Sequence, residues 1–180
     1  VPRSDGALRL LLVGSTERDH AFAAGVMQRV QGEPFHLEVL TSPVNRQAYE
    51  GLSNVTCLSG LSDPQLVEIY RRADLLFMPV LDCTANNAVM EAMACGTRVM
   101  ANRAGGIPEY VKADCNYLFD RKDMDEWVAA LRRLDGNRAE LPARRAAVRA
   151  WAESMDWRLI KRQYLALYDA AVGEAKKTED

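Results

Sequence analysis

The residues best suited to chemistry lie between Asp82 and Gly96, in a segment enclosed by two apolar runs. A short helix is expected there, and within its interior, Ala88–Cys95, Glu91 is the one polar side chain. A carboxylate without a partner in apolar surroundings is costly or becomes neutral. We therefore expect Glu91 to be buried and either ion-paired or hydrogen-bonded.

The start of this helix resembles an anion site. Helical side chains lean toward the N-terminus, so Glu91 should point to the turn where Asn86 and Asn87 open the helix. Free backbone amides at a helix start favour phosphate, and both asparagines can also act as helix caps. A phosphate at the helix start, with a carboxylate one turn below to accept hydroxyl hydrogen bonds, suits a ribose diphosphate.

Apolar strands alternate with helices along the chain, which predicts an α/β fold with an open parallel sheet and helices on both faces. The expected strands are 7–13, 35–40, 54–58, 74–80, 97–101 and 116–119. Thr16 with Asp19, and Ser62 with Gln65, have the spacing of capping boxes at two helix starts. Three helices close the chain, at about 123–134, 140–153 and 156–173, and the last is expected to bury Leu159, Ile160, Tyr164, Leu167, Tyr168 and Val172.

Four loops of interest each follow an expected strand: 14–18, 59–62, 80–87 and 102–106. The carboxyl ends of parallel strands share one edge of a sheet, where open α/β sheets bind their ligands. The sequence therefore predicts that Arg18, Asn86 and the Gly105–Gly106 pair gather at that edge. The alternatives without a function are that Arg18 is a solvated surface residue and that Gly105 and Gly106 only form a turn.

The composition fits one soluble domain. The chain has 180 residues, 48% of them hydrophobic, and a formal net charge of −2, which gives no electrostatic case for nucleic acid. No apolar run approaches the ~20 residues that a membrane span needs. Cys57, Cys83, Cys95 and Cys115 form no metal-binding or disulfide pattern, so we expect reduced thiols in a cytoplasmic protein and no metal site.

We assign residues 7–175 to the domain. Residues 1–6 begin with Val-Pro-Arg-Ser, which resembles the remnant of an engineered protease site, and are expected to be a disordered or engineered lead-in. Asp123-Met124-Asp125 has the spacing of a metal-binding Asp-x-Asp, but acids at a helix start complement the helix dipole. We interpret this triplet as a helix start.

Several motifs together resemble the group 1 (family 4) retaining glycosyltransferases, over roughly residues 8–172. The motifs are Leu61-Ser62-Asp63, Ala73-Asp74, a strand ending in Pro79, Glu91-Ala92-Met93-Ala94-Cys95-Gly96, Gly105-Gly106-Ile107-Pro108-Glu109 and Asp156-Trp157 with Tyr164 and Tyr168. The resemblance implies the C-terminal, Rossmann-like half of a GT-B enzyme, which binds the nucleotide-sugar donor.

The resemblance also implies roles for single residues. Glu91 matches the second acid of a motif of two Glu separated by seven residues, the acid that holds the ribose. Asn86 and Asn87, with Ala85 in the same turn, fall where backbone amides meet the diphosphate. Arg18 is near the family's basic residue for the phosphates, and Gly105 and Gly106 would allow close approach to the donor.

The sequence departs from the family at position 83. Cys83 stands where the first Glu should contact the transferred sugar, and Asp82 is the adjacent acid that could replace it if the loop shifts by one residue. Cys83 is read as a passive small residue, since no basic partner is near in sequence.

The resemblance implies that the intact enzyme transfers a hexose from a UDP- or GDP-linked donor, without a bound metal, as in polysaccharide biosynthesis. Arg18 and Asp82 are then the catalytic candidates. An N-terminal acceptor-binding half is expected as the partner, and any membrane attachment would be peripheral and made through that half. The fragment alone should bind nucleotide weakly and transfer nothing. The rival functions are a non-catalytic nucleotide-binding module and a nucleotide-sugar epimerase.

Overall fold

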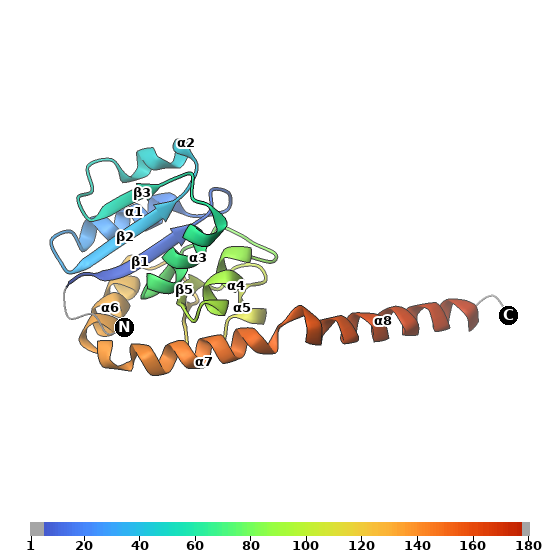
Figure 1. Ribbon diagram of the computed structural model, residues 1–180. Helices are drawn as coiled ribbons and strands as arrows, with labels where there is room; N and C mark the ends of the chain where they lie inside the picture. The colour runs from blue at the N-terminus through green and yellow to red at the C-terminus, as the bar shows by residue number, and fades with distance from the viewer. Residues whose placement is uncertain (1–5, 178–180) are drawn as a thin grey trace.

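The computed structural model describes residues 6–177, so most of the expected lead-in lies outside the described residues. One parallel sheet of six strands, in the order β3-β2-β1-β4-β5-β6, forms the centre of the domain (Figure 1). The strands are β1 (Leu8–Val13), β2 (Phe35–Leu40), β3 (Val55–Leu58), β4 (Leu75–Met78), β5 (Arg98–Asn102) and β6 (Tyr117–Phe119). The doubly wound sheet predicted from the apolar runs is confirmed.

The central strands are largely apolar because helices cover both of their faces. Every residue of β4 and β5 is buried, and four of the six residues of β1 are buried as well. Leu10 of β1 pairs with Leu75 of β4, which in turn pairs with Arg98 of β5. Continuous apolar runs of this kind are typical of strands inside a parallel sheet.

On one face of the sheet, α1 (His20–Arg29) and α6 (Met124–Gly136) pack around a fully buried tryptophan. The Trp127 ring lies 5.2 Å from Phe22, 5.1 Å from Phe77 and 5.0 Å from Phe119, centroid to centroid. Such aromatic clusters add about 0.5–1.5 kcal/mol per pair beyond the area that they bury.

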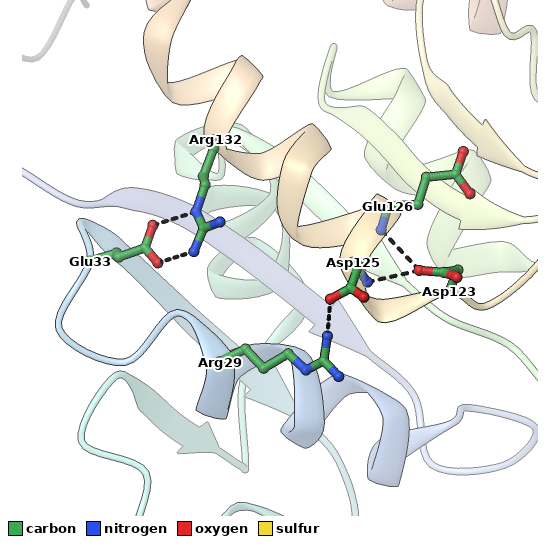
Figure 2. A network of polar contacts seen from close by, with 6 residues as sticks. All are labelled: Arg29, Glu33, Asp123, Asp125, Glu126 and Arg132. Carbon is green, nitrogen blue, oxygen red and sulfur yellow. Dashed lines mark hydrogen bonds and ion pairs between the residues drawn. The ribbon is translucent and has the colours of Figure 1, made fainter.

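Ion pairs at the surface fasten α6 to α1 and to the loop that follows it (Figure 2). Arg132 donates to both carboxylate oxygens of Glu33, at 3.0 and 2.7 Å, and Arg29 pairs with Asp125. Asp123 caps α6, since its side chain accepts from the backbone amides of Asp125 and Glu126. This confirms that the Asp-x-Asp triplet is a helix start.

The opposite face of the sheet carries α3 (Asp63–Arg72), α4 (Asn87–Ala94) and α7 (Leu141–Ser154). Val89, Ala92 and Met93 of α4 join Tyr70 of α3 and Val148 of α7 in a second buried cluster. This cluster fixes α4 against the ends of β4 and β5. The remaining short helices are α2 (Pro43–Arg46), η1 (Gln47–Tyr49), α5 (Ile107–Tyr110) and η2 (Arg138–Glu140).

One of the two predicted capping boxes is confirmed and the other is wrong. At α3, the backbone amide of Ser62 donates to Gln65 Oε1 at 2.8 Å. At α1, Asp19 itself is the cap and accepts from the amide of Phe22 at 3.0 Å, so the helix begins at His20 and not near Thr16. The amide of Asp19 donates to the carbonyl of Pro79 at 2.9 Å, which joins the residues before the helix to the loop after β4.

The expected burial of the last helix is wrong. α8 (Trp157–Lys177) runs away from the sheet after α7 (Figure 1). Of the residues expected to be buried, Ile160 is half-buried and the others are exposed: Leu159, Tyr164, Leu167, Tyr168 and Val172. Leu167 is 65% exposed and Tyr168 is 64% exposed. The helical spacing predicted an apolar face, but no element among residues 6–177 covers it. Within the same residues, no helix is long and apolar enough to cross a membrane.

Candidate functional site

The order of the strands changes direction between β1 and β4, and the loops that follow these two strands interlock. Arg18 forms an antiparallel bridge with Val80, and the amide of Leu81 donates to the carbonyl of Glu17 at 3.0 Å. Glu17 takes a left-handed backbone conformation, with φ of 56°. Ligands of doubly wound folds bind at this point, outside the carboxyl ends of the strands.

Asn86 joins these loops to the start of α4. Its side chain is only 2% exposed, and its Oδ1 accepts from the amide of Val89 at 3.3 Å and from Arg18 Nη2 at 3.2 Å. Its Nδ2 is buried and has no hydrogen-bond partner in the described part of the chain. A buried donor without a partner is unusual, and it lies at the start of α4, where the first backbone amides of a helix have no partner within the helix.

Arg18 is half-buried and fixed by carbonyl groups of its own loop. Its Nε donates to the carbonyl of Val13 at 3.1 Å and its Nη1 to that of Thr16 at 3.0 Å. Gly14 makes room for it, because a Cβ there would lie 2.7 Å from the guanidinium. Burial lowers the pKa of Arg18 from its usual value. The guanidinium thus brings a positive charge to the helix start.

Glu91 lies elsewhere than predicted. It is exposed on the outer side of α4 and not buried, but it has the expected partner, since Tyr70 donates its hydroxyl proton to Glu91 Oε2 at 2.9 Å. The buried face of α4 is formed by Ala88, Val89, Ala92 and Met93. Ala94 is exposed like Glu91 and Met90 is half-buried, so the apolar residues around Glu91 wrongly indicated that it is buried.

A cavity of about 530 Å³ lies next to the helix start, between the loop after β4 and the loop after β5. Its walls include four residues that were predicted to meet the donor, namely Asp82, Ala85, Gly105 and Gly106. The other lining residues are Cys83, Thr84, Glu109 and Tyr110. The Cys83 thiol lies 3.8 Å from the carbonyl of Ala104 and 3.9 Å from the Tyr110 hydroxyl. The exposed Asp82 accepts at 2.8 Å from the amide of Cys83.

The two glycines of the second loop have a structural reason of their own. A Cβ at Gly105, where φ is +50°, would lie 1.7 Å from the carbonyl oxygen of Cys83. A Cβ at Gly106 would lie 2.4 Å from that of Thr84. The loops therefore meet so closely that only glycine fits, and the amide of Gly106 donates to Cys83 at 2.8 Å. The side-chain positions of both glycines are filled by the neighbouring loop.

The predicted residues are thus brought to one edge of the sheet. Arg18 and Asn86 are in direct contact, while Asp82, Ala85, Gly105 and Gly106 line the adjacent cavity. Asn87 is exposed as the first residue of α4. The sequence reasoning missed Tyr70, Thr84 and Tyr110. Tyr70 carried a usable signal, because a tyrosine on a buried helix face needs a partner for its hydroxyl.

The four cysteines are free, as expected, but Cys57, Cys83 and Cys95 are only half-buried. Burial raises the pKa of the Cys57, Cys95 and Cys115 thiols. Among residues 6–177, no three His, Cys, Asp or Glu side chains are arranged to hold a metal ion.

Comparisons with known proteins identify the family to which the chain belongs. The model of the family described as glycosyl transferases group 1 matches residues 3–137. Over 130 residues, 68% of the chain, it is 35% identical to an MMP α-(1→4)-mannosyltransferase of Mycolicibacterium hassiacum. Over 112 residues, 59% of the chain, it is 37% identical to a D-inositol 3-phosphate glycosyltransferase of Mycolicibacterium smegmatis. The matched parts are 31% and 26% of those proteins.

Solved structures share the fold. The sucrose-phosphate synthase of Thermosynechococcus elongatus superposes with a TM-score of 0.79 over 96% of this chain and 47% of its own, at 20% identity. WaaG, a glycosyltransferase involved in lipopolysaccharide biosynthesis, gives 0.70 over 85% of this chain and 44% of its own, at 23% identity. The chain thus spans about half of those proteins and less than a third of the curated relatives named above. With the family model covering most of its length, the chain belongs to the group 1 glycosyltransferases.

Proposed function

We propose that this chain is the donor-binding half of a retaining hexosyltransferase that uses a nucleoside diphosphate sugar. The observation that carries the proposal is the environment of Asn86. Its buried Nδ2 has no partner among the described residues, and it lies beside Arg18 at the start of α4. One anionic group could accept hydrogen bonds from Asn86 Nδ2, from Arg18 and from the first amides of α4, as phosphates do at helix starts.

The diphosphate would lie over Ala85, Asn86 and Asn87, with its charge facing Arg18. Glu91 would accept hydrogen bonds from the ribose hydroxyls, since its carboxylate is exposed and is held by Tyr70. The transferred sugar would occupy the cavity of about 530 Å³ between Asp82 and the Gly105–Gly106 loop. Asp82 is the acid assigned to that sugar.

The chemistry proposed for these residues is electrostatic. When the bond between the anomeric carbon and the diphosphate oxygen breaks, the electron pair leaves with the diphosphate. Arg18 and the amides of α4 would stabilise that developing charge, a contribution of several kcal/mol in comparable sites. The new bond forms to an acceptor hydroxyl oxygen, whose proton is released. Because Arg18 and the amides supply positive charge, the proposal includes no metal, and chelation with EDTA should leave turnover of the full-length enzyme unchanged.

The acceptor site belongs to the proposed N-terminal half, so the 180-residue chain should bind nucleotide without transferring sugar. The proposed location is the cytoplasm, where nucleotide sugars are made. Any contact with a membrane surface would be made through the other half of the enzyme.

Isothermal titration calorimetry with UDP and GDP tests the proposal. The wild-type chain should bind one of them, and Glu91→Ala should weaken that binding about 10-fold, the equivalent of about 1.4 kcal/mol. Glu68→Ala is the matched control, because Glu68 is an exposed acid on the neighbouring α3. Equal heats for Glu91→Ala and wild type would remove Glu91 from the site, and no binding of either nucleotide would reject the proposal.

A non-catalytic nucleotide-binding module is the second candidate, and Cys83 favours it. The thiol stands where the family resemblance places an acid, and it is engaged by Tyr110 and the Ala104 carbonyl. Assays of the full-length protein with a panel of nucleotide sugars separate the two. Binding of a donor without turnover, over a range of acceptors, would favour the module.

A further inference from the structure

Tyr70 connects the core of the domain to the proposed ribose site. It lies in the last turn of α3 and is 1% exposed, and its backbone carbonyl accepts from Thr97 Oγ1 at 2.5 Å. From this fixed position its hydroxyl donates to Glu91 Oε2 on α4 at 2.9 Å. The buried Tyr70 is thus hydrogen-bonded to the exposed carboxylate of Glu91.

The proton in this contact belongs to the tyrosine. Burial, with the negative charge of Glu91 next in effect, raises the pKa of Tyr70 well above its usual range. Tyr70 is therefore a permanent donor and Glu91 the acceptor. Within residues 6–177 the Glu91 side chain makes no other hydrogen bond, so Oε1 and one lone pair of Oε2 remain available to a ligand.

An exposed glutamate on a helix normally samples several rotamers, and ordering it on binding costs conformational entropy. The contact with Tyr70 restricts that freedom before a ligand arrives. We infer that Tyr70 is a positioning residue that presets Glu91 to accept hydrogen bonds from the two adjacent hydroxyls of a ribose. This inference rests on the proposed function of Glu91. It adds that the hydroxyl of Tyr70 makes the site selective for ribose over deoxyribose.

A purely structural role makes a different prediction. If the hydroxyl of Tyr70 only satisfies its own need for a partner, Tyr70→Phe changes stability and leaves ligand selectivity as it was. The inference requires that the loss of nucleotide affinity in Tyr70→Phe depends on the ribose hydroxyls and on Glu91. Tyr49→Phe is the matched control, since Tyr49 is also buried and its hydroxyl lies 2.8 Å from His20 Nδ1, on the other face of the sheet.

The experiment is calorimetry of the 180-residue chain with UDP and 2′-deoxy-UDP, and with GDP and 2′-deoxy-GDP. Four proteins are compared, namely wild type, Tyr70→Phe, Glu91→Gln and the double variant, with circular dichroism to confirm folding. Tyr70→Phe should weaken binding of the ribonucleotide roughly 3–10-fold and that of the deoxynucleotide less than about 2-fold. The double variant should bind like Glu91→Gln alone, and Tyr49→Phe like wild type.

The outcomes separate this inference from the function on which it rests. If Glu91→Gln loses affinity but Tyr70→Phe keeps both affinity and selectivity, the inference is wrong and the donor site stands. An additive loss in the double variant also overturns it, because Tyr70 would then act independently of Glu91. If Glu91→Gln binds like wild type, or wild type binds neither nucleotide, the proposed function fails and the inference fails with it.

Discussion

Arg18 Nη2 donates to Asn86 Oδ1 at 3.2 Å, and this contact joins residues that are 68 positions apart in the chain. It connects the loop after β1 to the start of α4 across the point where the sheet changes direction. The positive charge of Arg18, in the loop after β1, is thereby placed at the start of α4, which follows β4. The proposed diphosphate site depends on this contact.

Replacing Arg18 by Ala should weaken binding of UDP or GDP about 10-fold, because charge-assisted hydrogen bonds are worth roughly 1.5–3 kcal/mol. The corresponding monophosphate should lose less, since it has less charge at the helix start. Calorimetry with both ligands measures the difference. Arg46→Ala is the control, because Arg46 donates to the carbonyl of Leu58, the last residue of the outer strand β3, and not to the start of α4. Equal losses for the two variants would contradict the assignment.

Gly105→Ala should destabilise the fold by more than about 2 kcal/mol, because a Cβ would lie 1.7 Å from a backbone oxygen and the loops would have to separate. Gly32→Ala is the comparison, since its φ is +88° but a Cβ there meets nothing within 4 Å. It should cost only the strain of a left-handed conformation, roughly 1–2 kcal/mol. Denaturant unfolding measures both, and a Gly105→Ala no worse than Gly32→Ala would refute the close loop contact.

The stability of the domain should fall as the pH drops below about 6.5, the ordinary pKa of histidine. Burial lowers the pKa of His20, which lies between the hydroxyls of Tyr49 and Thr41. As the pH falls, His20 of the unfolded chain therefore takes up a proton at a higher pH than His20 of the folded chain. The contribution of neutral His20 to stability is complete above about pH 6.5 and is lost as the pH falls toward the lower pKa of the folded chain. Unfolding free energies at pH 7 and pH 5.5 for wild type and His20→Gln should show a smaller decrease in the variant. An identical decrease would exclude His20 as the cause.

Polar substitutions on α8 should leave the unfolding free energy of the domain nearly unchanged. Leu159 and Leu165 are 55% and 60% exposed, so replacing each with Ser should cost less than about 0.5 kcal/mol. Val148→Ala in α7 removes fully buried methyl groups and should cost about 1–3 kcal/mol. Denaturant titrations compare them, and a large effect at Leu159 or Leu165 would mean that α8 packs against the domain in solution.

The strands and their edge were predictable because strands covered on both faces need continuous apolar runs, which stand out in the sequence. The start of α4 was predictable too, since Asn86 is a common helix cap. The burial of Glu91 was predicted wrongly because the neighbouring Met90, which is half-buried, and Ala94, which is exposed, are both apolar and hide the helical period. Its true environment depends on Tyr70, 21 residues earlier, and a local pattern cannot contain that contact.

Other errors have the same origin in tertiary contacts. The capping box at Thr16 fits the local spacing, but the bridge between Arg18 and Val80 draws this segment toward the loop after β4. The apolar face of α8 was read correctly from its spacing, while what it packs against depends on surfaces that the sequence pattern does not specify. The Gly105–Gly106 pair was expected to allow close approach of the donor, and its packing against the carbonyls of Cys83 and Thr84 is a further requirement for glycine that the sequence did not reveal.

A crystal structure of the chain with bound UDP or GDP tests the central claim most directly. The account predicts diphosphate oxygens within hydrogen-bond distance of Arg18, of Asn86 Nδ2 and of the first amides of α4, with a ribose hydroxyl against Glu91. A nucleotide bound at the opposite edge of the sheet, or with its ribose turned away from Glu91, would contradict it.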